Sequence, residues 1–294
     1  MTLPSLFRLL ALAAIWGGSF LFTRIGVPEL GAVILVESRV GLAALFLLVV
    51  ALILRKPLNL DQHWRHYLIL GVFNAALPFL LFGYAALTLT ASALSILNAT
   101  TPIWGAVIGA LWARQPLSMR TVLGLSLGVT GVGVIVGFDH WAAQSGAGVA
   151  IAAALLATVC YGIATTYARN AIHVDSFSNA HGSMWAATLC IVPALPFAAS
   201  TTTPGTGIML AVLALGVVCT GIAFLLYFRL VKDIGATSTL TVTFLIPVFG
   251  ILWGHLFLNE AVTTSMIAGS LIVIAGTALA TEFNPATLWR RKTS

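Results

Sequence analysis

Ten apolar runs, each of about 20 residues, make up most of the sequence, and short breaks with charged residues, proline or glycine separate them. A helix that crosses the hydrocarbon core of a bilayer needs about 20 predominantly apolar residues. Each run therefore has the length and character of a transmembrane helix. The runs cover residues 5–25, 31–54, 66–88, 91–113, 120–138, 147–169, 177–198, 207–229, 236–257 and 263–282.

The composition excludes most other classes of protein. Hydrophobic residues make up 60% of the 294 residues and charged residues only 7%, whereas soluble proteins carry roughly 25% charged residues. So few charges cannot cover the surface of a water-soluble domain. The sequence therefore predicts an all-α integral membrane protein with ten transmembrane helices, which contacts the lipid bilayer and has no separate soluble domain.

No signature of catalysis is present in the sequence. It contains no HExxH, no Walker loop, no GxSxG and no acid-rich metal cluster. We therefore predict that the protein is not an enzyme and that it uses no cofactor and no metal. A membrane-embedded enzyme would need clustered His, Asp or Cys at one depth. A scaffold protein is a further alternative, which a helix bundle without a hydrated cavity would support.

An internal repeat appears when the chain is shifted by 145 residues. Chance similarity between apolar helices favours Leu and Ala, but here glycines and prolines coincide without a gap. The matched pairs include Gly17 with Gly162, Gly71 with Gly216, Pro102 with Pro247, Gly105 with Gly250, Gly109 with Gly254, Gly124 with Gly269 and Gly131 with Gly276. We predict one repeat over residues 1–145 and a second over 146–294. Because five helices is an odd number, the second repeat enters the bilayer inverted.

The distribution of cations predicts the orientation. With ten helices, one side of the membrane carries both tails and the loops after helices 2, 4, 6 and 8. Positive residues favour the cytoplasm, so we expect both termini there, in a bacterial inner membrane. The net charge of +6 is then an orientation signal, and nucleic-acid binding is not predicted. The cations on this side are Arg8, Arg55, Lys56, Arg65, Arg114, Arg120, Arg169, Arg229, Lys232, Arg290, Arg291 and Lys292.

Inverted repeats place a substrate site near the centre of the bilayer, at interrupted helices. Pro102 and Pro247 lie in the middle of helices 4 and 9, and each removes the hydrogen bond of the carbonyl four residues earlier. Those carbonyls belong to Asn98 and Thr243. The prolines are either hinges or packed kinks. The small residues around them are explained equally well by close helix packing.

Aromatic and polar side chains at similar depth complete the candidate substrate site. Aromatic residues with a polar tip need a polar partner when they lie inside a membrane, which suggests the wall of a cavity, although they also fill cores. The candidate binding residues are Trp16, Phe79, Asn98, Thr101, Trp104, Tyr161, His181, Trp185, Phe224, Thr243 and Phe244.

Ionisable residues inside the apolar runs are few. Glu37 and Arg39 lie two positions apart, so they do not share a helix face. Arg39 either pairs with another helix or extends to an interface. His181 either titrates during transport or is packed and neutral. Because most helices lack a mid-depth acid, we expect a neutral or zwitterionic substrate. Glu260 is interpreted as a cap at the start of the last helix.

The chain resembles the drug/metabolite transporter superfamily, in its ten-helix EamA-type branch. The resemblance is carried by residues 15–20 (IWGGSF), 246–250 (IPVFG) and 258–260 (LNE), with Gly269 and Gly276 in the last helix. Gln115 stands where the second repeat has Glu260. Within the superfamily, the chain is similar to the YddG-type exporters of amino acids, including aromatic ones. This resemblance implies export across the inner membrane by alternating access, through a central cavity between the repeats.

Together these observations predict an exporter of neutral, hydrophobic and aromatic amino acids. The alternative on the same fold is export of other small metabolites or toxic organic compounds. Either function requires a small-molecule substrate and a lipid bilayer, and a monomer is compatible with both.

Overall fold

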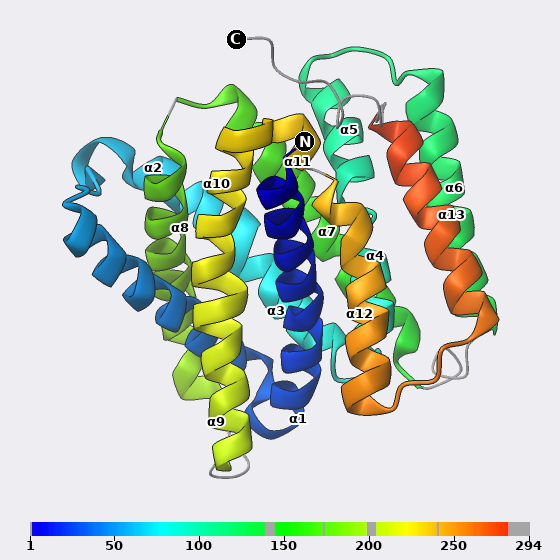
Figure 1. The fold of residues 1–294 in the computed structure, drawn as a ribbon, viewed down its shortest axis with the longest axis horizontal. Helices are drawn as coiled ribbons and strands as arrows, with labels where there is room; N and C mark the ends of the chain where they lie inside the picture. Colours follow the sequence, from blue (N-terminus) through cyan, green and yellow to red (C-terminus); the bar gives the residue numbers. More distant parts are fainter. Residues whose placement is uncertain (1, 139–144, 173, 199–203, 240, 282–294) are drawn as a thin grey trace.

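The computed structural model describes residues 2–138, 145–172, 174–198, 204–239 and 241–281. Arg290, Arg291 and Lys292, which contribute to the predicted orientation, lie outside the described residues. Within the described ranges the regular structure is helical throughout (Figure 1). The first repeat of the sequence contains α1 Leu3–Leu54, α2 Leu60–Gly71, η1 Val72–Ala76, α3 Leu77–Ala85, α4 Ala91–Asn98, α5 Thr101–Trp112 and α6 Met119–Phe138. The remainder contains α7 Ala147–Asn170, α8 Ser176–Ile191, η3 Val192–Phe197, α9 Thr206–Leu213, η4 Ala214–Ile222, α10 Ala223–Ile234, α11 Ala236–Thr239, α12 Val242–Leu258 and α13 Thr264–Ala280.

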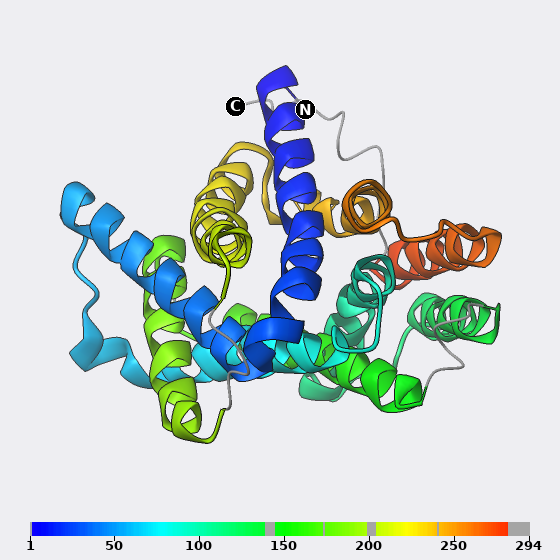
Figure 2. The ribbon, with the colours of Figure 1, turned by 90° about the horizontal axis from the view of Figure 1, so that it is seen from below.

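Helix α1 combines two predicted transmembrane runs. Its 52 residues would extend about 78 Å if straight, far more than a bilayer requires. The backbone departs from helical geometry at Gly31, with φ 71° and ψ 163°. Glycine tolerates this positive φ because it has no Cβ. The two parts of α1 consequently run in different directions (Figure 2). The kink therefore connects the two predicted transmembrane helices where a loop was expected.

Five helical segments are long and apolar enough to cross a membrane, and three shorter apolar helices accompany them. The long segments are Leu3–Leu54, Leu60–Ala85, Ala91–Trp112, Ala147–Asn170 and Thr206–Ile234. The shorter helices are Met119–Ile135, Val242–Leu258 and Thr264–Ala280. These segments are the elements of a multi-pass membrane protein.

Glycines allow the helices to approach closely, and their contacts occur in pairs that are related by the 145-residue shift. A Cβ on Gly17 would lie 2.9 Å from the backbone of Gly250, and one on Gly162 would lie 3.0 Å from the backbone of Gly105. Gly71 packs on α8 in the same way as Gly216 packs on α1. Small residues permit such contacts between membrane helices, where dispersion rather than water exclusion drives association.

Helices α6 and α13 lie side by side at one edge of the molecule in both views (Figures 1 and 2). A Cβ on Gly124 would meet the backbone of Gly276, and one on Gly131 would meet the backbone of Gly269. The shift of 145 residues exchanges these two contacts with each other.

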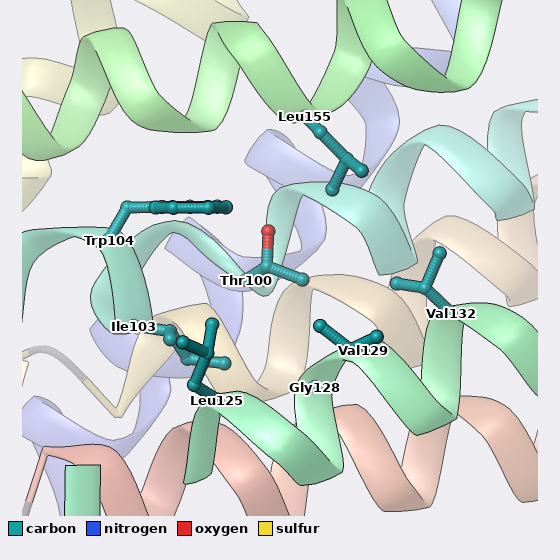
Figure 3. A pocket seen from close by; sticks show the side chains of 8 residues that line it. All are labelled: Thr100, Ile103, Trp104, Leu125, Gly128, Val129, Val132 and Leu155. Carbon is teal, nitrogen blue, oxygen red and sulfur yellow. The ribbon is translucent and has the colours of Figure 1, made fainter. Parts of the chain in front are cut away.

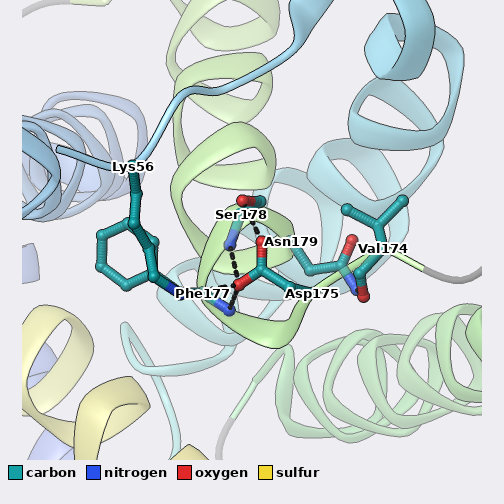
Figure 4. A network of polar contacts seen from close by, with 6 residues as sticks. All are labelled: Lys56, Val174, Asp175, Phe177, Ser178 and Asn179. Carbon is teal, nitrogen blue, oxygen red and sulfur yellow. Dashed lines mark hydrogen bonds and ion pairs between the residues drawn. The ribbon is translucent and has the colours of Figure 1, made fainter. Parts of the chain in front are cut away.

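Polar contacts join several helix ends on the side where α1 begins. Arg8 lies 2.7 Å from Asp233, which also contacts Arg229 at 3.2 Å. Asp175 caps α8 by accepting hydrogen bonds from the backbone nitrogens of Phe177 and Ser178. Figure 4 shows this carboxylate beside Lys56, whose Nζ lies 3.4 Å away. The loops after α1 and α7 therefore meet at this end.

Candidate functional site

A buried cation, Arg39, contacts Phe79, one of the aromatic residues that the sequence singled out. It comes from the second part of α1 and is 9% exposed. Its guanidinium carbon is 3.6 Å from the centre of the Phe79 ring, and its Nε donates a 3.0 Å hydrogen bond to Thr220 Oγ1 in η4. Of the two predicted alternatives, Arg39 therefore contacts other helices and does not extend to an interface.

Several predicted aromatic residues pack on the core cluster that contains Phe79. Phe79 is buried in a core cluster, against which Tyr161, Trp185 and Phe224 pack. The Tyr161 ring stacks on Phe82, with ring centres 6.3 Å apart. These side chains come from α3, α7, α8 and α10, which only the tertiary structure brings together.

His181 forms a pair with one of these aromatic residues. It is buried, and its Nε2 accepts a 2.9 Å hydrogen bond from Trp185 Nε1. A histidine nitrogen that accepts a hydrogen bond carries no proton. The arrangement therefore favours a packed histidine that is neutral at this nitrogen over a titrating one.

The helix break near Pro102 differs from the prediction. After Asn98 the α-helical hydrogen bonding is interrupted, because the backbone nitrogens of Ala99 and Thr100 bond carbonyls only three residues earlier, and a new helix, α5, begins at Thr101. Pro102 is therefore in the first turn of α5, where its missing N–H costs no hydrogen bond, and it does not lie within a continuous helix. Pro247, by contrast, lies inside α12. The two matched prolines thus occupy different local structures.

Polar groups near this break differ in how they are satisfied. Thr101 Oγ1 is buried and has no hydrogen-bond partner in the described part of the chain. Its neighbour Thr100 donates to the Leu97 carbonyl at 2.7 Å and to Thr158 Oγ1 at 3.2 Å. Asn98 is half-buried, as are Thr243 and Phe244 in the first turn of α12. An unpartnered buried hydroxyl costs free energy, which makes Thr101 a candidate ligand contact.

The two predicted tryptophans of helices 1 and 4 have other neighbours, although Trp16 packs against one core cluster together with Tyr161. Trp16 packs beside Tyr227, with ring centres 5.7 Å apart. Trp104 lines an apolar cavity of about 100 Å³ between α5, α6 and α7. Figure 3 shows Thr100 as the polar side chain in this lining, together with Leu155 and Val132. The candidate residues are therefore distributed over more than one space.

Glu260 forms a contact that the sequence interpretation missed. We expected this residue to cap the last helix, but Thr263 caps α13 by accepting from the Met266 backbone nitrogen. The Glu260 carboxylate instead accepts from the backbone nitrogens of Ala91 and Ser92 at 2.7 and 3.0 Å, and from Ser92 Oγ at 2.5 Å. A carboxylate at a helix N-terminus is stabilised by the exposed N–H groups and the helix dipole. Glu260 thus joins the end of α12 to the start of α4.

The crossing of α4 and α12 is tightly packed beside this carboxylate. A Cβ on Gly250 would collide with the Ser95 side chain, and one on Gly254 would lie 2.7 Å from Ser92 Oγ. The matched glycines of the first repeat behave differently. A Cβ on Gly105 or Gly109 would have no described atom within 4 Å. In the first repeat, α5 packs against α7, α6 and α13 instead.

Comparison with known proteins assigns the family. The model of the EamA-like transporter family matches residues 3–137 and again residues 148–281. The chain belongs to the EamA-like transporter family. It is therefore a membrane transporter of the drug/metabolite transporter superfamily, it acts on a small-molecule substrate, and it is not an enzyme. The predictions of membrane insertion, transport and family membership are confirmed.

Individual relatives of this EamA-family chain are distant but cover nearly its full length. "Uncharacterized transporter YoaV" of Bacillus subtilis is 24% identical over 288 residues, which is 97% of both chains. "Probable terminal-alkyne amino-acid exporter" of Streptantibioticus cattleyicolor is 24% identical over 284 residues, or 94% of this chain and 92% of the relative. A solved crystal structure with 18% identity superimposes with a TM-score of 0.67 and covers 96% of this chain and 98% of its own. The last similarity concerns the fold.

Proposed function

We propose that this EamA-family transporter exports amino acids across the bacterial inner membrane by alternating access. Ten membrane crossings form two inverted repeats, over residues 1–145 and 146–294, with both termini in the cytoplasm. The observation that carries the mechanism is the unequal packing of matched helix crossings. Gly250 and Gly254 pack tightly against α4, whereas Gly105 and Gly109 face open space among the described atoms.

The glycine contacts support the inverted repeats. The shift of 145 residues relates the Gly17 contact with Gly250 to the Gly162 contact with Gly105, and exchanges the two contacts between α6 and α13. Helix ends repeat as well, since Arg114 and Asn259 both have positive φ, at 52° and 53°. The π-helical segments η1 and η4 also overlap under the shift. A pseudo-two-fold axis near α6 and α13 accounts for these pairs.

Alternating access requires two helix–helix contacts that are related by the repeat to be packed unequally in any one state. If the repeats are equivalent, either crossing can close, and the molecule exposes its site at the end whose crossing is open. Here the closed crossing, with Glu260, lies away from the polar contacts of Arg8 and Asp233. With cations on the cytoplasmic side, this packing supports a state that is open to the cytoplasm.

Amino acids are the substrate class that the side chains favour. Aromatic faces of Phe79, Tyr161 and Phe224 suit an apolar or aromatic side chain. The unpartnered Thr101 hydroxyl suits a polar group of the backbone type. The relative from Streptantibioticus cattleyicolor, whose name is that of an amino-acid exporter, supports the same class. The YddG-type exporters of aromatic amino acids are the subtype that we propose.

Uptake by proteoliposomes tests this function. Purified protein is reconstituted, and entry of labelled L-phenylalanine and L-leucine is measured by counterflow against liposomes without protein. We expect protein-dependent exchange of both. Equal signals in protein-free liposomes would contradict amino-acid transport. Competition by quaternary amines or dyes, without competition by amino acids, would favour export of toxic organic compounds instead.

A further inference from the structure

Arg39 keeps most of its hydrogen-bonding capacity unused. A guanidinium carries five N–H donors, and in the described residues only its Nε makes a hydrogen bond, to Thr220. Thr220 in turn donates to the Leu215 carbonyl at 2.9 Å, so its position is fixed. The guanidinium carbon lies over the Phe79 ring, 3.6 Å from the ring centre. The terminal nitrogens are thereby oriented but unpaired.

The charge of Arg39 is also unneutralised in the described part of the chain. The three ion pairs found there are those of Arg8, Lys56 and Arg229, all at the end where α1 begins. Glu37 does not serve as the counter-ion, because it lies two positions away on the helix, and its Oε2 is itself buried without a partner. A charged residue inside a membrane protein faces a cavity or a partner and marks a functional path.

The surroundings of Arg39 define what it can bind. A guanidinium with free terminal nitrogens matches the two oxygens of a carboxylate in a bidentate pair. Phe79 provides a ring face beside it, and Tyr161 packs on the same core cluster as Phe79. On α7, Gly162 directly follows Tyr161 and packs on the backbone of Trp104 and Gly105, about one helical turn beyond the unpartnered hydroxyl of Thr101. A ligand at the free nitrogens of Arg39 meets a cation that is held against the ring of Phe79.

We propose that Arg39 is the carboxylate-binding residue of the transport site, and that the substrates are organic carboxylates with an apolar or aromatic side chain. This inference rests on the proposed transport function and adds the group that selects the substrate. Thr220 and Phe79 hold the guanidinium in place, and Tyr161 contacts the apolar part of the ligand. A substrate without a carboxylate leaves the cation unpaired and is rejected.

The test compares ligands that differ in the carboxylate alone. Counterflow in proteoliposomes is measured with labelled L-phenylalanine and L-phenylalanine amide for the wild-type protein and for Arg39→Gln and Arg39→Lys. We expect the wild-type protein to prefer the acid by about tenfold or more, as a charge-assisted bidentate pair predicts. Arg39→Gln loses this preference while its amide transport persists, and Arg39→Lys restores part of it. A purely structural role would lower both rates together.

A matched control is available in Arg24, whose guanidinium already donates to the carbonyls of Ala86 and Leu87 at 2.7 and 3.2 Å. Arg24→Gln is expected to keep the acid preference. Should Arg39→Gln fail to give a monodisperse protein, Thr220→Val is used, because it removes the hydrogen bond that orients the guanidinium and is expected to reduce the preference. An unchanged preference in Arg39→Gln, or in Thr220→Val where that variant is used, would overturn the proposal.

A third ligand, 3-phenylpropionate, has the carboxylate but no amino group. It distinguishes failure of the proposed amino-acid transport from failure of the proposed role of Arg39. Transport of 3-phenylpropionate but not of phenylalanine, abolished by Arg39→Gln, would overturn amino-acid export and support the role of Arg39. Transport of phenylalanine and its amide at equal rates would support amino-acid export and overturn the role of Arg39. Transport of none of the three would overturn both.

Discussion

Two crossings of related sequence adopt different packing in this EamA-family transporter. At one, α4 meets the end of α12, Gly250 is pressed against Ser95, and Glu260 bonds the first turn of α4. At the matched positions of the first repeat, Gly105 and Gly109 are half-buried with open space beside them among the described atoms, and Gln115 is exposed. The same glycines therefore serve a closed crossing in one place and an open one in the other.

This difference teaches that the glycines allow either pair of helices to pack closely. The side chains beside each pair decide which of the two contacts forms. Glu260 offers a charge to the N–H groups of α4, while Gln115 can offer only a neutral amide. A charged acceptor is bound about twice as strongly as a neutral one. We therefore expect the state with the Glu260 crossing closed to be the more stable of the two.

The largest effect is expected when a side chain is added at the closed crossing. Gly250→Val places atoms on the Ser95 side chain, and because both lie on packed helices, the crossing must separate. Overpacking of this kind costs about 1–3 kcal/mol. We expect a lower Tm in detergent and loss of transport in proteoliposomes.

Gly105→Val is the matched variant at the open crossing. No described atom lies within 4 Å of a Cβ at Gly105, so the Tm is expected to stay near the wild-type value, while transport is lost because the crossing can no longer close. A large fall in Tm for Gly105→Val, equal to that of Gly250→Val, would contradict the assigned difference between the crossings.

The second effect concerns the carboxylate of Glu260. Glu260→Ala leaves the nitrogens of Ala91 and Ser92 without this acceptor, and loss of a helix cap costs roughly 1 kcal/mol. We expect the closed crossing to open more often. The measurement is the rate at which a Ser95→Cys thiol, with Cys160, Cys190 and Cys219 replaced, reacts with a membrane-impermeant reagent.

Gln115→Ala supplies the control for that experiment, because Gln115 is exposed. The thiol in the Gln115→Ala variant should be labelled at the same rate as in the Ser95→Cys protein that keeps both Glu260 and Gln115. If Glu260→Ala also left the rate unchanged, Glu260 would not hold the crossing shut.

A smaller effect sharpens the comparison between neighbouring threonines at the α4–α5 break. Thr101→Val removes a hydroxyl that has no described partner, so we expect stability to be unchanged or slightly higher while transport falls. Thr100→Val breaks two hydrogen bonds and should cost about 1 kcal/mol. Thermal unfolding of both variants, beside counterflow rates, separates a ligand contact from a structural one. Equal destabilisation by the two substitutions would refute this assignment.

The smallest effect is expected at Asp175, far from either crossing. Burial alone would raise the pKa of Asp175, but hydrogen bonds from Ser178 and the nearby Lys56 ammonium outweigh it and hold the pKa below its ordinary value. The carboxylate thus stabilises the folded state fully above its ordinary pKa, and this stabilisation disappears as pH falls through the lower folded-state value. We expect the Tm difference between wild type and Asp175→Ala to be a few degrees at pH 6, as for a cap of about 1 kcal/mol. It should shrink toward pH 3, and a difference independent of pH would contradict the assignment.

The sequence predicted part of the proposed site, and the reasons for the omissions are physical. Phe79, Tyr161, Trp185 and Phe224 were candidates, and they pack on one cluster. Arg39 was noticed, but its partners lie 40 and 181 positions away in the chain, and no local spacing indicates them. The role of Glu260 was missed for the same reason, since it bonds a helix that begins 169 residues earlier.

The linear sequence by itself determined that the chain is a helical membrane protein. The length and polarity of an apolar run are local properties, and insertion into a bilayer depends on them. It also determined the matched positions of proline and glycine on which the proposed repeats rest. Only the tertiary structure decided which crossing is closed, where the break before Pro102 falls and what surrounds Arg39. Matched glycines are identical in sequence, so the choice between them depends on which helices meet, and that is a property of the packed molecule.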